Sequence, residues 1–294
     1  MKKLVAGLSI LTVVACARTA TAPPRTATAP PRAASIVRLA AKPAAPVRVV
    51  VRDATSIDDF WKATVARPRR ITATRGTIRA SAVYPDPSPY HSRVRVTDGA
   101  RTLVDAVVGD VPMGWRFAQL EGHRPVLLYD GFTGGAHCCF ETGIVHLGSG
   151  ERGVTPVVWG DLGDTLVPSA SGTGSVFRTG DDQMAYAFSS FAASTFAIKM
   201  LAYRGGRMRD VTPEYPALIE RDARDQWQIY LERKHEPDAN FHASVYPPLV
   251  SYLADEYRLG RGPQAWSRVR AANGSAPAFY AHAKAWLRGH GYAP

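Results

Sequence analysis

The chain has little cysteine and no long apolar run. Three cysteines occur in 294 residues, namely Cys16 and the adjacent pair Cys138 and Cys139. The most apolar stretch, at residues 4–15, is shorter than the about 20 residues that a membrane-spanning helix needs. The motifs H-E-x-x-H, G-x-S-x-G and C-x-x-C are also absent. Their absence argues against a zincin, an α/β-type serine hydrolase and a thioredoxin-like redox pair.

The N-terminus has the pattern of a bacterial export signal. Two lysines precede the apolar stretch, and V-V-A-C at residues 13–16 resembles a lipobox. This pattern predicts that residues 1–15 are a signal peptide and that the thiol of Cys16 is acylated. Ordinary cleavage after residues 15–17 is the alternative. Ala17 resembles the default for sorting to the periplasmic face of the outer membrane, so the predicted location is a lipid-anchored position there.

A spacer follows the lipobox. The sequence T-A-T-A-P-P-R stands at residues 19–25 and repeats unchanged at residues 26–32. Alanine, threonine and paired prolines form no core, and proline holds the backbone extended. We therefore predict a semi-rigid linker over residues 16–46 that holds the folded part away from a bilayer.

The charge balance is basic, with 36 lysines and arginines against 25 acidic residues. In an exported protein this excess could attract anionic headgroups, another envelope polyanion or a protein partner. A solvated arginine-rich surface is the alternative. No nucleic-acid-binding motif is present, so nucleic acid is not an expected partner.

Residues 47–209 predict a β-rich domain. Short stretches alternate between apolar and polar residues and are rich in β-branched and aromatic side chains, which is typical of strands. They lie at residues 77–83, 93–97, 125–129, 142–147, 155–159, 184–188 and 196–203. Glycine-rich turns separate them at residues 98–99, 148–153 and 205–206. The spacing favours an antiparallel sandwich or a propeller-like fragment.

Residues 210–294 predict a small helical subdomain, so the fold class is α+β. T-P-E at residues 212–214 offers a cap, a proline and an early carboxylate at a helix start. Apolar residues then recur at helical spacing, and further helices are expected at residues 248–259, at 264–272 and up to Gly289. Their aromatic residues are interpreted as packing.

Two acidic turns are candidates for calcium, although neither has the regular spacing of a calcium loop. Asp161 and Asp164 lie in the first turn, and Asp181 and Asp182 lie in the second. Carboxylates clustered in turns supply the hard oxygen ligands that calcium prefers. Aspartate and glycine are also common in turns for conformational reasons alone, so a purely structural role stays open.

The adjacent cysteines have four possible roles. A vicinal disulfide between Cys138 and Cys139 is the first; adjacent Cα atoms are about 3.8 Å apart, so its ring would be strained and would fix the turn. Two buried thiols are the second. The third is a metal site with His137 and His146, although neighbouring strand residues point to opposite faces. The fourth is a reactive cysteine assisted by His137.

The run T-G-G-A-H-C-C at residues 133–139 resembles a signature of exported bacterial proteins of no established activity. In that family the signature follows a D-x-D-G-D-G-x-P loop of the FG-GAP/VCBS type, and the resemblance extends over residues 116–293. It implies a propeller-like, calcium-associated domain with a helical tail, and a functional turn at Gly134, Gly135 and His137. Here residues 119–125 read Q-L-E-G-H-R-P instead, so only Glu121 keeps a carboxylate.

The sequence therefore predicts an exported, lipid-anchored envelope protein that acts as a binding or structural module. No complete catalytic constellation is found. The run G-S-G-E-R-G at residues 148–153 matches G-x-G-x-x-G, but a strand is expected after it and not the helix that a dinucleotide site needs, so we interpret it as a hairpin turn. The alternative is a thiol- or metal-dependent enzyme centred on His137, Cys138 and Cys139, with a nearby acid such as Asp130 or Glu141.

Overall fold

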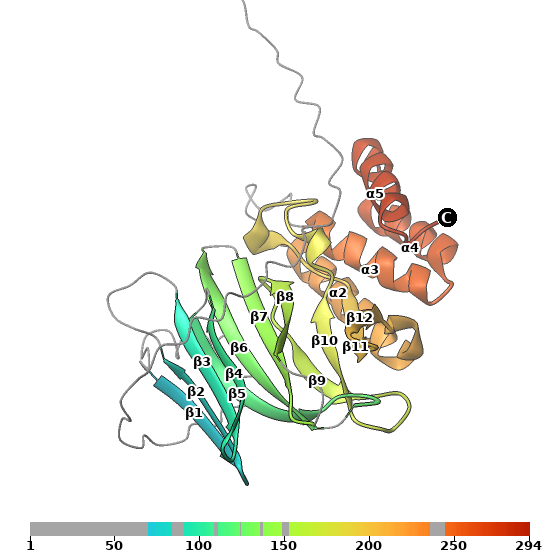
Figure 1. Ribbon diagram of the computed structural model, residues 1–294. Helices are drawn as coiled ribbons and strands as arrows, with labels where there is room; N and C mark the ends of the chain where they lie inside the picture. The colour runs from blue at the N-terminus through green and yellow to red at the C-terminus, as the bar shows by residue number, and fades with distance from the viewer. Residues whose placement is uncertain are drawn as a thin grey trace, which may run out of the picture. The chain divides into compact units, whose positions relative to one another are not determined.

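The computed structural model describes residues 70–83, 91–108, 111–123, 125–135, 138–148, 153–235 and 245–294. In these residues the chain forms three antiparallel sheets of four strands, followed by four α-helices (Figure 1). The predicted α+β class, with a β-rich part and a helical C-terminal part, is confirmed. The predicted signal peptide, Cys16 and the linker lie outside the described residues.

Each sheet is an up-and-down meander, in which strands that follow one another in the chain are neighbours. The first sheet consists of β1 (Arg70–Arg75), β2 (Ile78–Val83), β3 (Ser92–Asp98) and β4 (Arg101–Val108). The second consists of β5 (Val111–Gln119), β6 (Pro125–Gly135), β7 (Cys138–His146) and β8 (Val154–Gly160). The third consists of β9 (Thr165–Pro168), β10 (Ser175–Gly180), β11 (Ile198–Arg204) and β12 (Arg207–Asp210).

The second sheet is buried on both faces. Leu127 and Tyr129 of β6 share an apolar cluster with Val94 of the first sheet. Leu128, between them, belongs to a different cluster that contains Phe177 of the third sheet. Consecutive strand residues point to opposite faces, so the second sheet lies between the other two. This layering explains why β6 is apolar almost without alternation.

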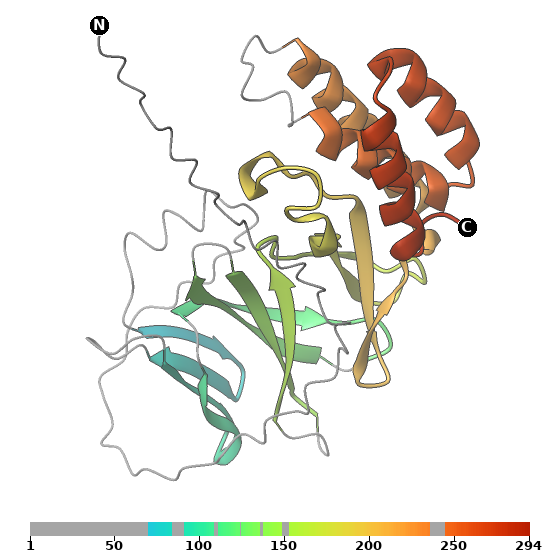
Figure 2. The ribbon, with the colours of Figure 1, turned by 90° about the horizontal axis from the view of Figure 1, so that it is seen from above.

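Four helices follow the third sheet. They are α2 (Pro216–Lys234), α3 (Tyr246–Arg258), α4 (Gly262–Asn273) and α5 (Pro277–Gly289). Each has a proline in its first turn, where the missing N–H costs no helical hydrogen bond. Ile219 of α2 packs with Met200 on the outer face of the third sheet, and the helices gather on that side (Figure 2). None of the described helices combines the length and apolar character that crossing a bilayer requires.

The predicted strand at residues 184–188 is wrong. Asp182–Met184 form a 3-10 helix, capped by Asp181, whose carboxylate accepts a bond from the N–H of Gln183. Met184 is buried in the helical core, where its sulfur accepts a bond from the N–H of Ala197. The alternating pattern of this segment therefore serves packing against helices and not pairing in a sheet.

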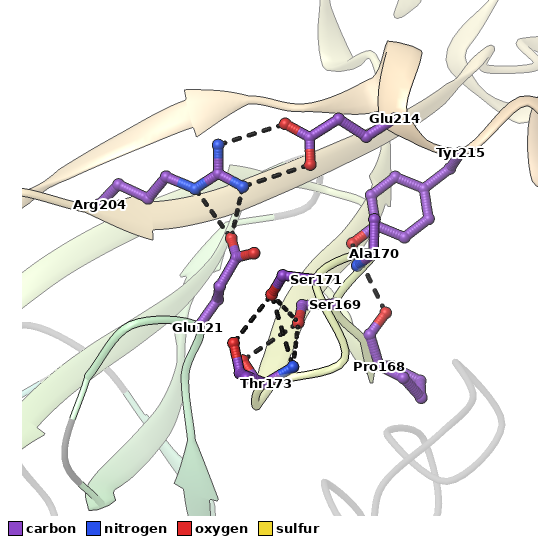
Figure 3. A network of polar contacts seen from close by, with 9 residues as sticks. All are labelled: Glu121, Pro168, Ser169, Ala170, Ser171, Thr173, Arg204, Glu214 and Tyr215. Atoms are coloured by element: carbon purple, nitrogen blue, oxygen red, sulfur yellow. Dashed lines mark hydrogen bonds and ion pairs between the residues drawn. The ribbon is translucent and has the colours of Figure 1, made fainter.

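A polar network ties the β5–β6 turn to the third sheet (Figure 3). The Nε of Arg204 donates to Glu121 over 2.8 Å, and the two terminal nitrogens donate to Glu214 over 3.2 Å each. The carboxylate of Glu121 in this turn is 8% exposed and paired with Arg204. The turn is thus fixed by an ion pair instead of by clustered carboxylates.

Candidate functional site

The segment that contains the adjacent cysteines, residues 133–139, joins β6 to β7 and is called the cysteine turn. Thr133 closes it, because its hydroxyl accepts a hydrogen bond of 2.6 Å from the backbone N–H of Cys139. Cys139 is disulfide-bonded. The predicted partner is Cys138, whose side chain lies outside the description, as does His137, so the vicinal pairing stays a prediction.

The strands that leave this turn run directly into a cavity. Phe132 pairs with Phe140, with ring centroids 5.1 Å apart, and Gly131 pairs with Glu141. Gly131, Phe140 and Glu141 line a cavity of about 420 Å³. This volume lies within the range of small-molecule sites, about 300–1,000 Å³. The strands on either side of the cysteine pair, β6 and β7, therefore contribute to a chamber large enough for a small organic ligand.

The cavity is formed by the second sheet, the third sheet and α2. Arg116 and Asp130 contribute from the second sheet, Arg178 from β10 and Asp222 from α2. Arg116, Asp130 and Thr142 lie on the strand face that farther along carries Leu128 and Ile144, so they continue that buried face beyond its apolar part. The cavity begins where the apolar packing between the two sheets ends.

One arginine organises the polar wall. Arg116 donates two hydrogen bonds of 2.6 Å to Asp130 and two of 2.9 Å to Asp164. Its side chain is 13% exposed and that of Asp164 is 4% exposed. A guanidinium has the fork geometry that such two-point pairs with carboxylates require. The three side chains are consequently held in one arrangement.

The electrostatics of this group are unbalanced. Burial lowers the pKa of Arg116, but the charges of Asp130 and Asp164 outweigh this effect and raise it. Burial raises the pKa of Asp164, while the attraction of Arg116 opposes the rise. The one positive charge of Arg116 is thus shared between the carboxyls of Asp130 and Asp164. The formal charge of these three side chains together is negative.

Thr142 and Trp159 complete the wall. The hydroxyl of Thr142 lies 2.8 Å from Asp130 and 3.1 Å from Asp164, and it donates toward both. It accepts a bond of 2.8 Å from the indole N–H of Trp159, which is buried. The donor and the acceptor functions of this hydroxyl are therefore both used, and the indole is fixed beside the cavity.

A pair of carboxyls lies at the helical side of the cavity. Asp222 lines the cavity and accepts a bond of 3.1 Å from the N–H of Ile198. Asp255 of α3 is fully buried, and no donor among the described residues reaches its oxygens. Burial raises the pKa of Asp255 well above its usual range, and the charge of Asp222 acts in the same direction. Burial and the neighbouring charge of Asp222 thus both favour the protonated form of Asp255.

The remaining wall is aromatic and partly cationic. Phe140, Trp159 and Phe196 line the cavity. Arg178 also lines it, and its charge lowers the pKa of Asp222. No residue in the described part of the chain forms a hydrogen bond or ion pair with the guanidinium of Arg178. A mainly apolar chamber with a few fixed polar groups is the usual form of a ligand site.

The four acids considered for calcium have separate environments. Asp164 is bound to Arg116, and Asp181 is bound to Lys199 over 3.2 Å and to the hydroxyl of Tyr292 over 2.6 Å. Asp182 accepts a backbone hydrogen bond from Asp161. Within the described ranges, no group of three or more histidines, cysteines or acids is arranged to hold a metal ion. The carboxylates of Asp164, Asp181 and Asp182 are thus each held by donors of the protein itself.

His146, considered as a metal ligand beside His137, has other neighbours in the structure. Its Nε2 lies 3.2 Å from the hydroxyl of Tyr203, and its ring centroid lies 6.1 Å from that of His123. Of the acids considered for an enzyme, Asp130 is bound to Arg116 and Glu141 lines the cavity. Burial raises the pKa of Glu141.

The most organised part of the site was not predicted from the sequence. Arg116, Thr142 and Trp159 carry no local motif, and Asp222 lies among other charged residues of α2. For Asp255 the sequence does contain a usable signal. Helical periodicity places it on the same helix face as Tyr252, and that face is apolar. A charged residue on such a face indicates a buried polar role.

No protein-family model, curated protein or solved structure matches the chain.

Proposed function

We propose that this protein is an exported, lipid-anchored module that binds a small organic ligand in the cavity between its second and third sheets. The observation that carries the proposal is the wall of that cavity. Arg116 and its two aspartates are fixed by four hydrogen bonds before any ligand arrives. A preformed wall lowers the entropic cost of binding, which is the property expected of a receptor site.

The state of Cys139 favours a binding module over a thiol enzyme. A cysteine nucleophile acts as a thiolate, and a disulfide-bonded cysteine has none. Cys139 is disulfide-bonded, and Thr133 holds its backbone in the turn beside the cavity. In this proposal the turn shapes the cavity edge, and the spacer at residues 16–46 holds the module away from the membrane.

A fragment screen tests the binding function. The purified full chain would be screened by ligand-observed NMR against a small library of amines, acids and neutral aromatics. We expect a set of hits that Thr165→Trp abolishes, because Thr165 lines the cavity and an indole would fill it. Thr165→Val, which keeps the volume, is the control and should retain the hits. If circular dichroism shows Thr165→Trp folded and its hits unchanged, the cavity is not the binding site.

The anchor has its own test. Replacing Cys16 with serine removes the only thiol of the predicted lipobox. The variant should leave the membrane fraction and appear as a water-soluble exported protein. A chain that still partitions with membranes to the same extent would contradict the lipid anchor while leaving the binding function intact.

A further inference from the structure

The charges around the cavity indicate what kind of ligand it takes. Its wall carries two guanidinium groups and four carboxyl groups, which belong to Arg116, Arg178, Asp130, Glu141, Asp164 and Asp222. The formal balance of the wall is therefore two negative charges. The whole chain has the opposite sign, with a net charge of +11. A negative chamber in a basic protein is a local feature that overall composition does not explain.

The two guanidinium groups do not neutralise the negative charge of the four carboxyl groups in the cavity wall. Arg116 is bound to Asp130 and Asp164 and has little left to offer a ligand. Arg178 acts on Asp222 through its charge and forms no ion pair with any described residue. An anionic ligand would bring a further negative charge into this wall, whereas a cationic one would relieve the repulsion among its carboxyls.

Asp222 is the carboxyl best placed to receive a cation. Its Oδ2 is positioned by the N–H of Ile198 and by Gln226, over 3.1 and 3.5 Å. Asp255 behind it is fully buried and has no donor among the described residues at either oxygen. Burial favours the protonated form of Asp255, so of the two carboxyls Asp222, which lines the cavity, is the one that carries a negative charge more readily. Burial raises the pKa of Asp222, as expected where a carboxylate lacks a close cation.

The aromatic side chains supply the rest of the environment. Phe140, Trp159 and Phe196 line the same cavity, and the faces of aromatic rings attract ammonium groups. Trp159 is held by Thr142, so its ring needs no reorganisation when a ligand enters. Carboxylates beside aromatic rings form an environment suited to an organic amine with an apolar body.

We infer that the cavity takes an organic cation, a small molecule that carries an ammonium group on an apolar or aromatic body, with the ammonium bound to Asp222. This inference rests on the proposed binding function and names the ligand class for the same cavity. The ammonium donates to the carboxylate, and the apolar body lies against the aromatic wall.

A matched series of probes tests the ligand class. 2-Phenylethylamine, 2-phenylethanol and 3-phenylpropionate share a phenyl ring and differ in charge, and each would be titrated into the purified full chain by calorimetry. We expect the amine to bind about tenfold or more tightly than the other two, the change that one charge-assisted hydrogen bond supplies. Calcium chloride is a fourth titrant, and it should not compete with the amine.

Asp222→Asn separates the role of the charge from that of shape. The amide keeps an oxygen for the N–H of Ile198, so the local fold should survive. We expect about a tenfold loss of amine affinity and little change for the alcohol. Asp225→Asn, on the exposed side of the same helix, is the matched control and should behave like the parent protein.

Acid should weaken amine binding in the parent protein. Burial raises the pKa of Asp222, so as pH falls toward that raised pKa its carboxyl gains a proton and loses its attraction for ammonium. The charged and titratable groups that face Asp222 are Asp255 from α3 and Arg178 from β10. The Asp222→Asn variant should show a smaller dependence on pH.

Four outcomes decide the matter. Tight amine binding that is lost in Asp222→Asn supports the inference. Equal binding of the three probes, abolished by Thr165→Trp, keeps the binding function and overturns the cationic class. Competition by calcium would replace the organic cation with a metal ion. No binding of the amine at up to ~10 mM, a free energy weaker than about −3 kcal/mol, would overturn the inference, and the fragment screen decides the proposed function separately.

Discussion

Arg116 and Asp164 lie 48 residues apart in the sequence and meet in a two-point ion pair, with both nitrogen–oxygen distances at 2.9 Å. The pair connects β5 of the second sheet to the segment that leads into β9 of the third. It stands in the wall of the cavity and determines how that wall is held. The first prediction concerns this contact, and the second concerns Thr142 beside it.

Arg116→Ala should destabilise the protein strongly. The variant leaves Asp130 and Asp164 without their guanidinium, and removing one partner of a buried ion pair costs about 3–5 kcal/mol. Urea denaturation at neutral pH measures the free energy of unfolding. Arg93→Ala is the control, because its pair with Asp105 is about one-third exposed on each side and should contribute at most about 1 kcal/mol. Equal losses in the two variants would contradict the assigned role of Arg116.

Thr142→Val should destabilise the protein through Trp159. The valine keeps the shape of the side chain and removes the hydroxyl that accepts the indole N–H. A buried donor left without an acceptor costs about 1–3 kcal/mol, which urea denaturation resolves. Thr142→Ser retains the hydroxyl and should lose less. The interpretation fails if the serine variant is as unstable as the valine variant.

Asp255→Asn should change how stability depends on pH. The folded-state pKa of Asp255 is raised, so the stabilising effect of its proton is complete below about pH 4 and is lost as pH rises through the folded-state pKa. Asparagine does not ionise and can donate to Asp222 in place of the acid. The stability of the variant relative to the parent should therefore increase with pH, by at most about 1.4 kcal/mol per pH unit. Urea denaturation from acid to neutral pH measures it.

A control and a contrary result define that experiment. Asp225 is exposed on α2, so Asp225→Asn should leave the pH profile of the parent unchanged. A difference between Asp255→Asn and the parent that is the same at every pH would show that folding does not raise the pKa of Asp255.

Cys139 should be paired with Cys138. In a chain with Cys16→Ser, Cys138 is the only other cysteine, so an intramolecular disulfide at Cys139 has a single possible partner. We expect no alkylation of the unfolded, unreduced variant by iodoacetamide, and two alkylated cysteines after reduction. Intact mass reads both results. Free alkylation before reduction, or a disulfide-linked dimer on a non-reducing gel, would contradict the vicinal pair.

Much of the candidate site lay beyond the reach of sequence patterns. The sequence predicts a turn at residues 133–139, because glycine and the adjacent cysteines restrict the backbone within a few residues. In the structure this segment joins the paired strands β6 and β7. For residues 184–188 the sequence predicts a strand, which is wrong, because alternation of apolar and polar residues is also compatible with a short 3-10 helix and the turn after it. Only contacts with Ala197 and with the helical core show that Met184 belongs to a 3-10 helix.

The sequence by itself determined the α+β class, with an antiparallel β-rich part followed by a helical C-terminal part, because the periodicity that distinguishes strands from helices acts within a few residues. The tertiary structure alone decided which polar residues meet. The contact of Arg116 with Asp164 and the proximity of Asp222 to Asp255 depend on the stacking of sheets and helices. Residues far apart in the chain are brought together only by that stacking. Burial then strengthens the interactions between their charges and shifts their pKa values.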